Sequence, residues 1–212
     1  MIDIFYWLTD NGRKALQIIE ETGLPHRKRP IDIGKREQFS PEYLKISPGH
    51  KIPALADDDG PGGTRVTLCE SGAILKYCAE KAGGALYPSA PAQRAKVDQW
   101  FFYGCATFTP LAQQYGLFHL RFGEDVPSVK KHYTEVMRDM FGMFDRHLAE
   151  NEYLAGSAYS IADIASYPDV RIHGKLGGLG GLDQYPNLNR WHDAIAARPA
   201  VQRAWGPLPA AS

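Results

Sequence analysis

Two short motifs in the first third of the chain carry residue types suited to holding a ligand. In Lys51-Ile52-Pro53, a proline directly precedes a short apolar run. A cis bond at that proline would expose the backbone N–H and C=O of Ile52. Those two groups can pair with an extended peptide as an added strand would. The alternative is a trans proline that only begins a strand.

The second motif, Glu70-Ser71, stands immediately before an apolar pattern of helical spacing. Ser71 is predicted to be the N-cap of that helix. A helix N-terminus offers free N–H groups and a partial positive charge to a carboxylate, and Glu70 beside it can accept from an ammonium group. Together the motifs predict a site that holds an extended peptide by its backbone and by both charges of a free amino-acid end. The alternative for this motif is an ordinary helix cap.

Apolar periodicity places both motifs in an α/β domain. Strands are predicted at residues 2–6, 26–33, 54–56 and 66–68, and helices at 12–21, at 41–46 and after Ser71. This order, βαβαββα, is typical of a thioredoxin-like fold. We therefore expect residues 1–82 to form a thioredoxin-like N-terminal domain.

The second part of the chain is predicted to be helical throughout. Glycines and prolines between residues 83 and 91 indicate a linker. Apolar recurrences every three or four residues then predict helices at 92–120, 128–150, 160–174 and 187–197. The stretch Ser160-Ile161-Ala162-Asp163 has the pattern of a capping box. We therefore expect residues 92–212 to form an all-helical C-terminal domain.

Composition and charge argue against several classes of protein. Lys plus Arg and Asp plus Glu are 24 each, so no excess charge favours nucleic acid or an anionic membrane as a partner. The cysteines Cys69, Cys78 and Cys105 form no metal or redox pattern and are expected to be buried free thiols. The histidines lack metal-site spacing, and the chain shows neither a signal-peptide pattern nor a membrane-length apolar run. We expect a soluble cytoplasmic protein without a metal.

Over nearly all of its 212 residues, the chain resembles the cytosolic glutathione transferases. In that family, the residue before a cis-proline pairs with the cysteinyl backbone of glutathione, and a Glu/Asp-Ser pair holds its γ-glutamyl end. Ile52-Pro53 and Glu70-Ser71 match those positions. The bacterial nu-class enzymes are the most similar, on the evidence of Thr9-x-Asn11-Gly12-x-Lys14, Gln38-Phe39, Ile46-Ser47-Pro48 and Lys51-Ile52-Pro53.

The resemblance implies that the glutathione thiol is held by neutral donors, Thr9 and Asn11, which would be the catalytic residues. Thr9 could instead simply cap the following helix, and Asn11-Gly12 could be a turn. Tyr6, the candidate nucleophile-activating residue of a tyrosine-type enzyme, lies in an alternating strand and is predicted to be packed rather than catalytic. The other residues that the resemblance assigns to glutathione in this part of the chain are Gln38 and Lys51 at the glycyl end, Ile52 through its backbone, and Glu70 and Ser71 at the γ-glutamyl end.

The helical domain is expected to add further contacts. Related enzymes place an Arg of the partner subunit near the glycyl carboxylate, and the aligned stretch here makes His132 or Lys131 the substitute, unless it is a solvated helix face. The aromatic face between residues 99 and 122 is first interpreted as core and subunit contact. Part of it could instead line a pocket for a second substrate. The candidates for that pocket are Tyr103, Phe108, Tyr115 and Tyr167.

The resemblance implies a homodimeric enzyme that uses glutathione as its cosubstrate. The expected reaction is thiol–disulfide exchange with GSH or GSSG bound between the domains, and conjugation of a small, aromatic or otherwise activated electrophile is expected as a second activity. Because no cysteine follows the first strand, the thiolate of bound glutathione, and not a protein thiol, would attack the disulfide. Two alternatives stay open, glutathione-dependent cleavage of an aromatic ether or halide, and a non-catalytic binding or regulatory protein of the same fold.

Overall fold

The computed structural model describes residues 1–174 and 176–206, which form two compact units. The first unit contains Met1–Tyr87 together with residues 198–206, and the second contains Pro88–Ala197. The predicted linker, residues 83–91, spans this division. The predicted second domain differs from the second unit at its end, since residues 198–206 belong to the first unit and residues 207–212 lie outside the described residues.

The first unit is built on a four-stranded mixed sheet in the order β2-β1-β3-β4, which confirms the thioredoxin-like arrangement. The strands are β1 (Ile2–Tyr6), β2 (His26–Pro30), β3 (Ala54–Asp57) and β4 (Val66–Cys69). β1 pairs in parallel with β2, while β3 is antiparallel to both β1 and β4. β2 ends at Pro30, three residues before the predicted end, because its partner β1 ends at Tyr6 in register with Pro30.

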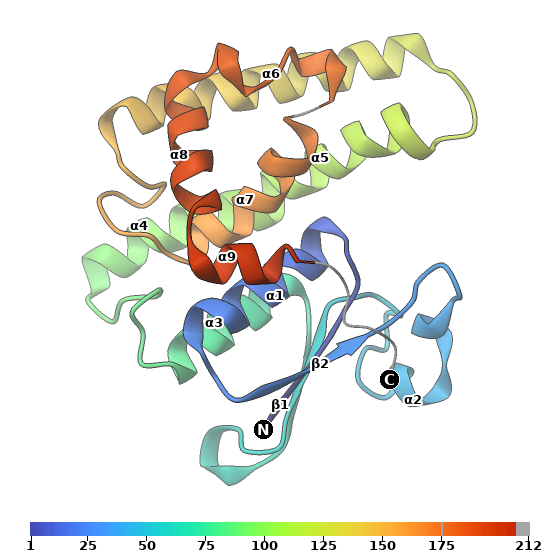
Figure 1. The fold of residues 1–212 in the computed structure, drawn as a ribbon, viewed down its shortest axis with the longest axis vertical. Coiled ribbons are helices and arrows are strands. Elements are labelled where there is room, and N and C mark those ends of the chain that lie inside the picture. The colour runs from blue at the N-terminus through green and yellow to red at the C-terminus, as the bar shows by residue number, and fades with distance from the viewer. Residues whose placement is uncertain (175, 207–212) are drawn as a thin grey trace. The chain divides into compact units, whose positions relative to one another are not determined.

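Helices α1 (Asp10–Thr22) and α3 (Ser71–Lys81) lie side by side in the first unit (Figure 1). The short helix α2 (Pro41–Leu44) is present as predicted but ends two residues before the predicted end at residue 46. Alternate residues Ile2, Ile4 and Tyr6 of β1 are buried. Phe5, which points to the opposite face of the sheet, contacts Tyr43 of α2.

Helix α9 (Pro199–Ala204) packs on α1, which explains why the end of the described chain belongs to the first unit. The Arg198 guanidinium donates to both carboxylate oxygens of Glu21, at 2.7 and 2.8 Å. Arg13 donates to the carbonyl of Ala204 at 2.6 Å, and its guanidinium lies over the Trp205 ring. These contacts join residues that are 177 and 191 positions apart in the sequence.

The second unit is helical, as predicted. Its helices are α4 (Pro91–Phe102), α5 (Thr109–Gly116), α6 (Pro127–Glu150), α7 (Ile161–His173) and α8 (Pro186–Ala196). The single helix predicted at 92–120 contains π-helical turns at Tyr103–Phe108 and Leu117–Arg121. Pro110 follows the first of these turns and lacks the N–H that a regular α-helix would use. The predicted capping box of Ser160 and Asp163 is present at the start of α7.

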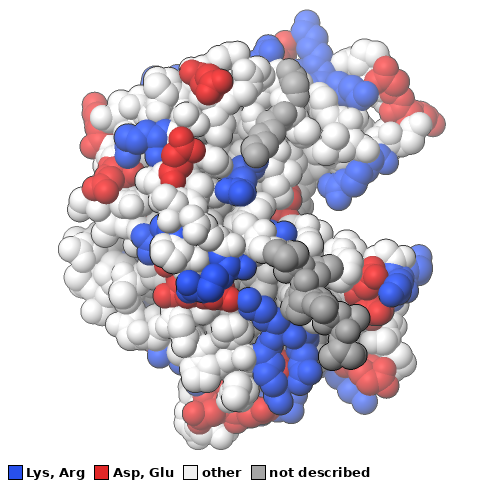
Figure 2. Space-filling model, in the orientation of Figure 1, with Lys and Arg blue, Asp and Glu red and all other residues white. Residues whose placement is uncertain are grey.

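None of the helices in the described ranges is long and apolar enough to cross a membrane. On the face shown in Figure 2, basic and acidic side chains are interspersed in small groups, in keeping with their equal numbers. The three cysteines are free thiols. Only Cys78 is fully buried, whereas Cys69 and Cys105 are half-buried, so the prediction of burial is confirmed for one of the three.

Candidate functional site

The predicted motifs of the first unit meet at one edge of its sheet. Ala54, the first residue of β3, pairs with Cys69, the last residue of β4, and also with Phe5 near the end of β1. The residues that adjoin these three paired positions at the edge of the sheet are therefore neighbours. They are Pro53, Glu70 and the loop from Trp7 to Thr9. The fold thus brings together segments separated by more than sixty positions in the sequence.

The bond between Ile52 and Pro53 is cis, as predicted. Neither the N–H nor the C=O of Ile52 has a hydrogen-bond partner within residues 1–174 and 176–206. In contrast, the carbonyl of the preceding residue, Lys51, accepts from Tyr43 Oη at 2.7 Å and from Ser47 Oγ at 2.8 Å. Ile52 therefore presents a free backbone donor and acceptor beside a firmly held peptide group.

Helix α3 begins one residue earlier than predicted, since Glu70 is its N-cap and Ser71 its first helical residue. The prediction of Ser71 as the N-cap was wrong because β4 extends to Cys69, which leaves Glu70 alone to make the turn. No side chain caps this end, and the first helical bond runs from Ile74 N–H to Glu70 O at 3.1 Å. The N–H groups before Ile74 remain available for an anion.

Glu70 makes that turn with a φ of 73°, a backbone conformation that L residues rarely adopt. Its side chain is exposed, and its carboxylate makes no hydrogen bond or ion pair within the described part of the chain. Non-glycine residues held in this region store strain and are concentrated at binding sites. Glu70 thus offers an unpaired carboxylate next to the anion-binding helix end.

Thr9 and Asn11 lie at the start of the other helix that reaches this edge. Thr9 is the N-cap of α1, and its Oγ1 accepts from Gly12 N at 3.2 Å. This confirms the capping role while leaving the hydroxyl hydrogen of Thr9 free to donate. A Cβ at Gly12 would lie 2.0 Å from Trp7 O, so only glycine permits this tight loop.

Asn11 joins the two helix ends directly. Its Oδ1 accepts from Ser71 Oγ at 3.3 Å. Its Nδ2 has no partner within residues 1–174 and 176–206, so both of its N–H donors are free. An amide with free donors, a hydroxyl donor and a helix end with free N–H groups therefore stand together. Ordinary sequence patterns gave no sign of the contact between Asn11 and Ser71.

Gln38 and Lys51, the residues predicted for the glycyl end, come from two loops that contact one another. Phe39 stacks on His50 with ring centroids 4.7 Å apart, and this contact draws the residues beside them together. Gln38 Oε1 is buried and has no partner within the described residues. The Lys51 side chain is exposed and makes no ion pair there. A carboxylate could pair with the Lys51 ammonium.

Tyr6 is packed, as predicted. It is 1% exposed at the end of β1, and burial raises the pKa of its phenol. A phenol with a raised pKa keeps its proton and carries no charge at neutral pH. Thr9 in the loop after β1 and Asn11 in the first turn of α1 keep side-chain donors that these contacts leave free.

The predicted residues of the second unit are found at different depths. Phe108, Tyr115 and Tyr167 are fully buried, Tyr103 is half-buried, and His132 is exposed on α6. Phe108 packs against Phe144, and Tyr167 packs against Trp191. These contacts agree with a core role for the aromatic face. A pocket role, and a role of His132 in binding, stay predictions.

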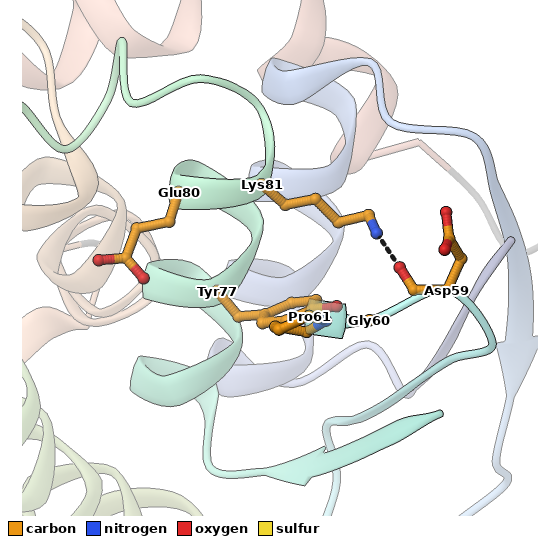
Figure 3. A pocket seen from close by; sticks show the side chains of 6 residues that line it. All are labelled: Asp59, Gly60, Pro61, Tyr77, Glu80 and Lys81. Carbon is orange, nitrogen blue, oxygen red and sulfur yellow. Dashed lines mark hydrogen bonds between the residues drawn. The ribbon is translucent and has the colours of Figure 1, made fainter. Parts of the chain in front are cut away.

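A hollow of about 410 Å³ lies between the turn after β3 and the end of α3. It is lined by Asp59, Gly60, Pro61, Tyr77, Glu80 and Lys81, and Lys81 donates to the Asp59 carbonyl there (Figure 3). Beside it, the buried Asp57 accepts from Tyr77 Oη at 2.7 Å and pairs with Lys81 Nζ at 2.9 Å. Asp57 stands at the opposite end of β3 from Ala54, so this network supports the sheet and is not part of the site.

Comparisons with known proteins agree with this geometry. The model of the glutathione S-transferase N-terminal domain matches residues 11–81, and that of the C-terminal domain matches residues 137–199. The disulfide-bond oxidoreductase YfcG of Escherichia coli (strain K12) is 36% identical over 205 residues, which cover 96% of this chain and 94% of that protein.

Solved structures are similar over the same length. A glutathione transferase family member from Pseudomonas fluorescens pf-5, crystallised with two glutathione bound, has a TM-score of 0.91 and 34% identity, and the match covers 96% of this chain and 92% of that one. A glutathione transferase from Pseudomonas putida, with one glutathione disulfide bound per subunit, has a TM-score of 0.90 and 34% identity, with 96% and 90% covered.

Proposed function

The chain belongs to the glutathione S-transferase family, and we propose that it catalyses glutathione-dependent reduction of disulfides, with the thiolate held by neutral donors. The observation that carries this proposal is the contact of Asn11 Oδ1 with Ser71 Oγ at 3.3 Å. It makes the proposed thiol donors and the proposed γ-glutamyl site parts of one constellation. The similarity to a protein named disulfide-bond oxidoreductase supports the same reaction.

The free groups of the site match the groups of glutathione in order. The unpaired Glu70 carboxylate would accept from the γ-glutamyl ammonium, and the N-terminus of α3 with Ser71 would receive its carboxylate. The free N–H and C=O of Ile52 would pair with the cysteinyl backbone. Lys51 and Gln38 would take the glycyl end. The sulfur would then lie toward the free donors of Thr9 and Asn11.

A free thiol has a pKa of about 8.5, so a reactive site must stabilise the thiolate. Hydrogen bonds from the Thr9 hydroxyl and the Asn11 amide favour the charged form and lower that pKa. The thiolate attacks one sulfur of a disulfide RSSR, which forms GSSR and releases RS⁻ to be protonated. A second glutathione thiolate attacks GSSR, and the products are GSSG and a second RSH.

This reaction needs no protein thiol. Cys78 is buried, and burial raises the pKa of its thiol to about 12, so it stays protonated at neutral pH. The two half-buried cysteines, Cys69 and Cys105, are the thiols that could compete as nucleophiles. Replacing both by serine therefore separates attack by bound glutathione from attack by the protein.

The experiment measures GSSG formed from glutathione and bis(2-hydroxyethyl) disulfide, coupled to glutathione reductase and NADPH. We expect one GSSG for each disulfide consumed, with the Cys69→Ser/Cys105→Ser variant as active as the unchanged protein. A folded double variant without activity would show that a protein thiol carries the reaction. Tight glutathione binding with no turnover of disulfides or electrophiles would favour a non-catalytic binding protein.

We also propose that the protein is a homodimer. Phe102 and Leu120 of the second unit are each 59% exposed, which is unusual for large apolar side chains and suits a surface covered by a second subunit. Light scattering at micromolar concentration should give twice the mass of one chain. A stable monomer would contradict this assembly.

A further inference from the structure

Two buried hydroxyl groups converge on the carbonyl that precedes the cis peptide. Tyr43 is 3% exposed and Ser47 is 1% exposed, and they donate to Lys51 O at 2.7 and 2.8 Å. A carbonyl oxygen has two lone pairs, so both are engaged. The direction of the Lys51 carbonyl is therefore fixed by two side chains that precede it by eight and four residues.

Fixing this carbonyl also fixes the Ile52 N–H. The two groups belong to one peptide unit, which is planar, and Ile52-Pro53 is the cis bond found in the described chain, so the Lys51–Ile52 bond is trans. In a trans peptide the C=O and the N–H point in opposite directions. Because Tyr43 and Ser47 hold the carbonyl on the inner side of the loop, the Ile52 N–H is turned outward, where it has no partner among the described residues.

The hydroxyl groups are themselves firmly placed. The Tyr43 ring packs edge-on against Phe5 of β1, with centroids 5.9 Å apart, and Tyr43 N–H donates to Ser40 Oγ. Ser47 N–H donates to the Tyr43 carbonyl at 2.9 Å. Burial raises the pKa of Tyr43 to about 12, so its hydroxyl keeps the proton that it donates throughout the pH range in which glutathione thiols react.

We propose that Tyr43 and Ser47 are positioning residues, which aim the Ile52 N–H at the cysteinyl carbonyl of the bound peptide. The inference rests on the proposed function, because it assigns the ligand carbonyl that this N–H meets. Both residues act through the Lys51 carbonyl and neither touches the ligand. They determine how well the site holds the peptide backbone, and they leave the thiol donors Thr9 and Asn11 unaffected.

The test compares two ligands in Tyr43→Phe, Ser47→Ala and the double variant, with dissociation constants measured by calorimetry. One ligand is glutathione, and the other is γ-glutamylcysteamine, which keeps the γ-glutamyl group and the thiol but has no cysteinyl carbonyl. We expect each single variant to raise the dissociation constant for glutathione about three- to tenfold. The double variant should raise it by more than the product of the two single effects, because in each single variant the remaining hydroxyl still holds the carbonyl. The affinity for γ-glutamylcysteamine should not change.

Kinetics give a second signature. The variants should raise KM for glutathione while kcat at saturation and the pKa of the bound thiol stay as in the unchanged protein. Tyr77→Phe is the matched control, since it removes another tyrosine hydroxyl of the same unit, one that donates to Asp57 and not to Lys51. This control should bind both ligands normally.

Two outcomes would overturn the inference. The first is an unchanged affinity for glutathione in both single variants, and this outcome can be read even if the double variant fails to fold. Alternatively, both ligands could weaken equally, which would mean that the substitutions loosen the whole site. An unchanged protein that fails to bind glutathione at all would instead reject the proposed function, and the inference with it.

Discussion

Two substitutions of Glu70 can separate the strain of its backbone from its proposed role in ligand binding. Its φ is 73°, and its carboxylate has no partner within residues 1–174 and 176–206. Glu70→Gly removes the strain together with the carboxylate, whereas Glu70→Ala removes the carboxylate alone. The difference between these two variants reports the backbone strain, offset by the conformational entropy of glycine, because both lose the same charge near the N-terminus of α3.

The expected size follows from two opposing terms. An L residue in the left-handed region costs about 1–2 kcal/mol, and a glycine adds about 0.5–1 kcal/mol of conformational entropy to the unfolded chain. Glu70→Gly should therefore be more stable than Glu70→Ala by up to about 1.5 kcal/mol, which corresponds to at most about 6 °C in Tm for a chain of this size. At an ordinary helical position the order would be reversed.

Glutathione binding should be weakened in both variants, whichever of them is the more stable. Both variants leave the ligand ammonium without its partner, which costs about 1.5–3 kcal/mol, or roughly ten- to a hundredfold in Kd. Thermal and denaturant unfolding measure the first effect and calorimetry with glutathione measures the second. If the alanine variant is the more stable of the two, Glu70 carries no strain, and if both bind glutathione normally, Glu70 is not the ammonium partner.

Two further predictions concern the same unit. Ser71→Ala should weaken glutathione binding by about 1–3 kcal/mol, measured by calorimetry, because a hydrogen bond to a charged group is lost. An unchanged affinity would rule out the proposed γ-glutamyl site. Burial alone would raise the pKa of Asp57, but hydrogen bonds from Lys81 and Tyr77 hold it at about 2. Because the pKa of Asp57 is lower in the folded state than the unfolded value of about 4, the charged carboxylate stabilises the folded protein above pH 4. This contribution, on the order of 1–2 kcal/mol after allowance for solvent screening, is lost as the pH falls toward 2. Acid unfolding of Asp57→Asn should lack this loss, and Asp58→Asn, at an exposed neighbour, should retain it.

The sequence predicted the elements of the first unit because local signals agree with the fold there. Alternation along β1 and the proline before β3 each indicate the structure that is found. The helical pattern beyond residue 91 was equally informative. Its π-helical turns were not predicted. The first of them depends on how Pro110 and its neighbours accommodate a missing backbone donor.

What sequence patterns missed depends on contacts between distant residues. The pair Arg198–Glu21, which ties α9 to α1, spans 177 positions, and no local pattern reports it. Similarly, Tyr43 and Ser47 have ordinary helix and loop surroundings, and their shared acceptor becomes visible only in the folded chain. The candidate site residues came from the family resemblance, while the contacts that position them became visible only in the structure.

The most direct test of the central claim is the pKa of the glutathione thiol bound to Asn11→Ala. Thiolate absorbance in the ultraviolet, titrated against pH, should show that pKa rising by about 1–2 units toward its value in solution, since one lost hydrogen bond to a charged group is worth about 1.5–3 kcal/mol. Thr9→Ala should have an equal or smaller effect, and Tyr6→Phe almost none, because Tyr6 is packed in β1. A normal thiol pKa in Asn11→Ala together with a lost thiolate in Tyr6→Phe would contradict the account and identify a tyrosine-type enzyme.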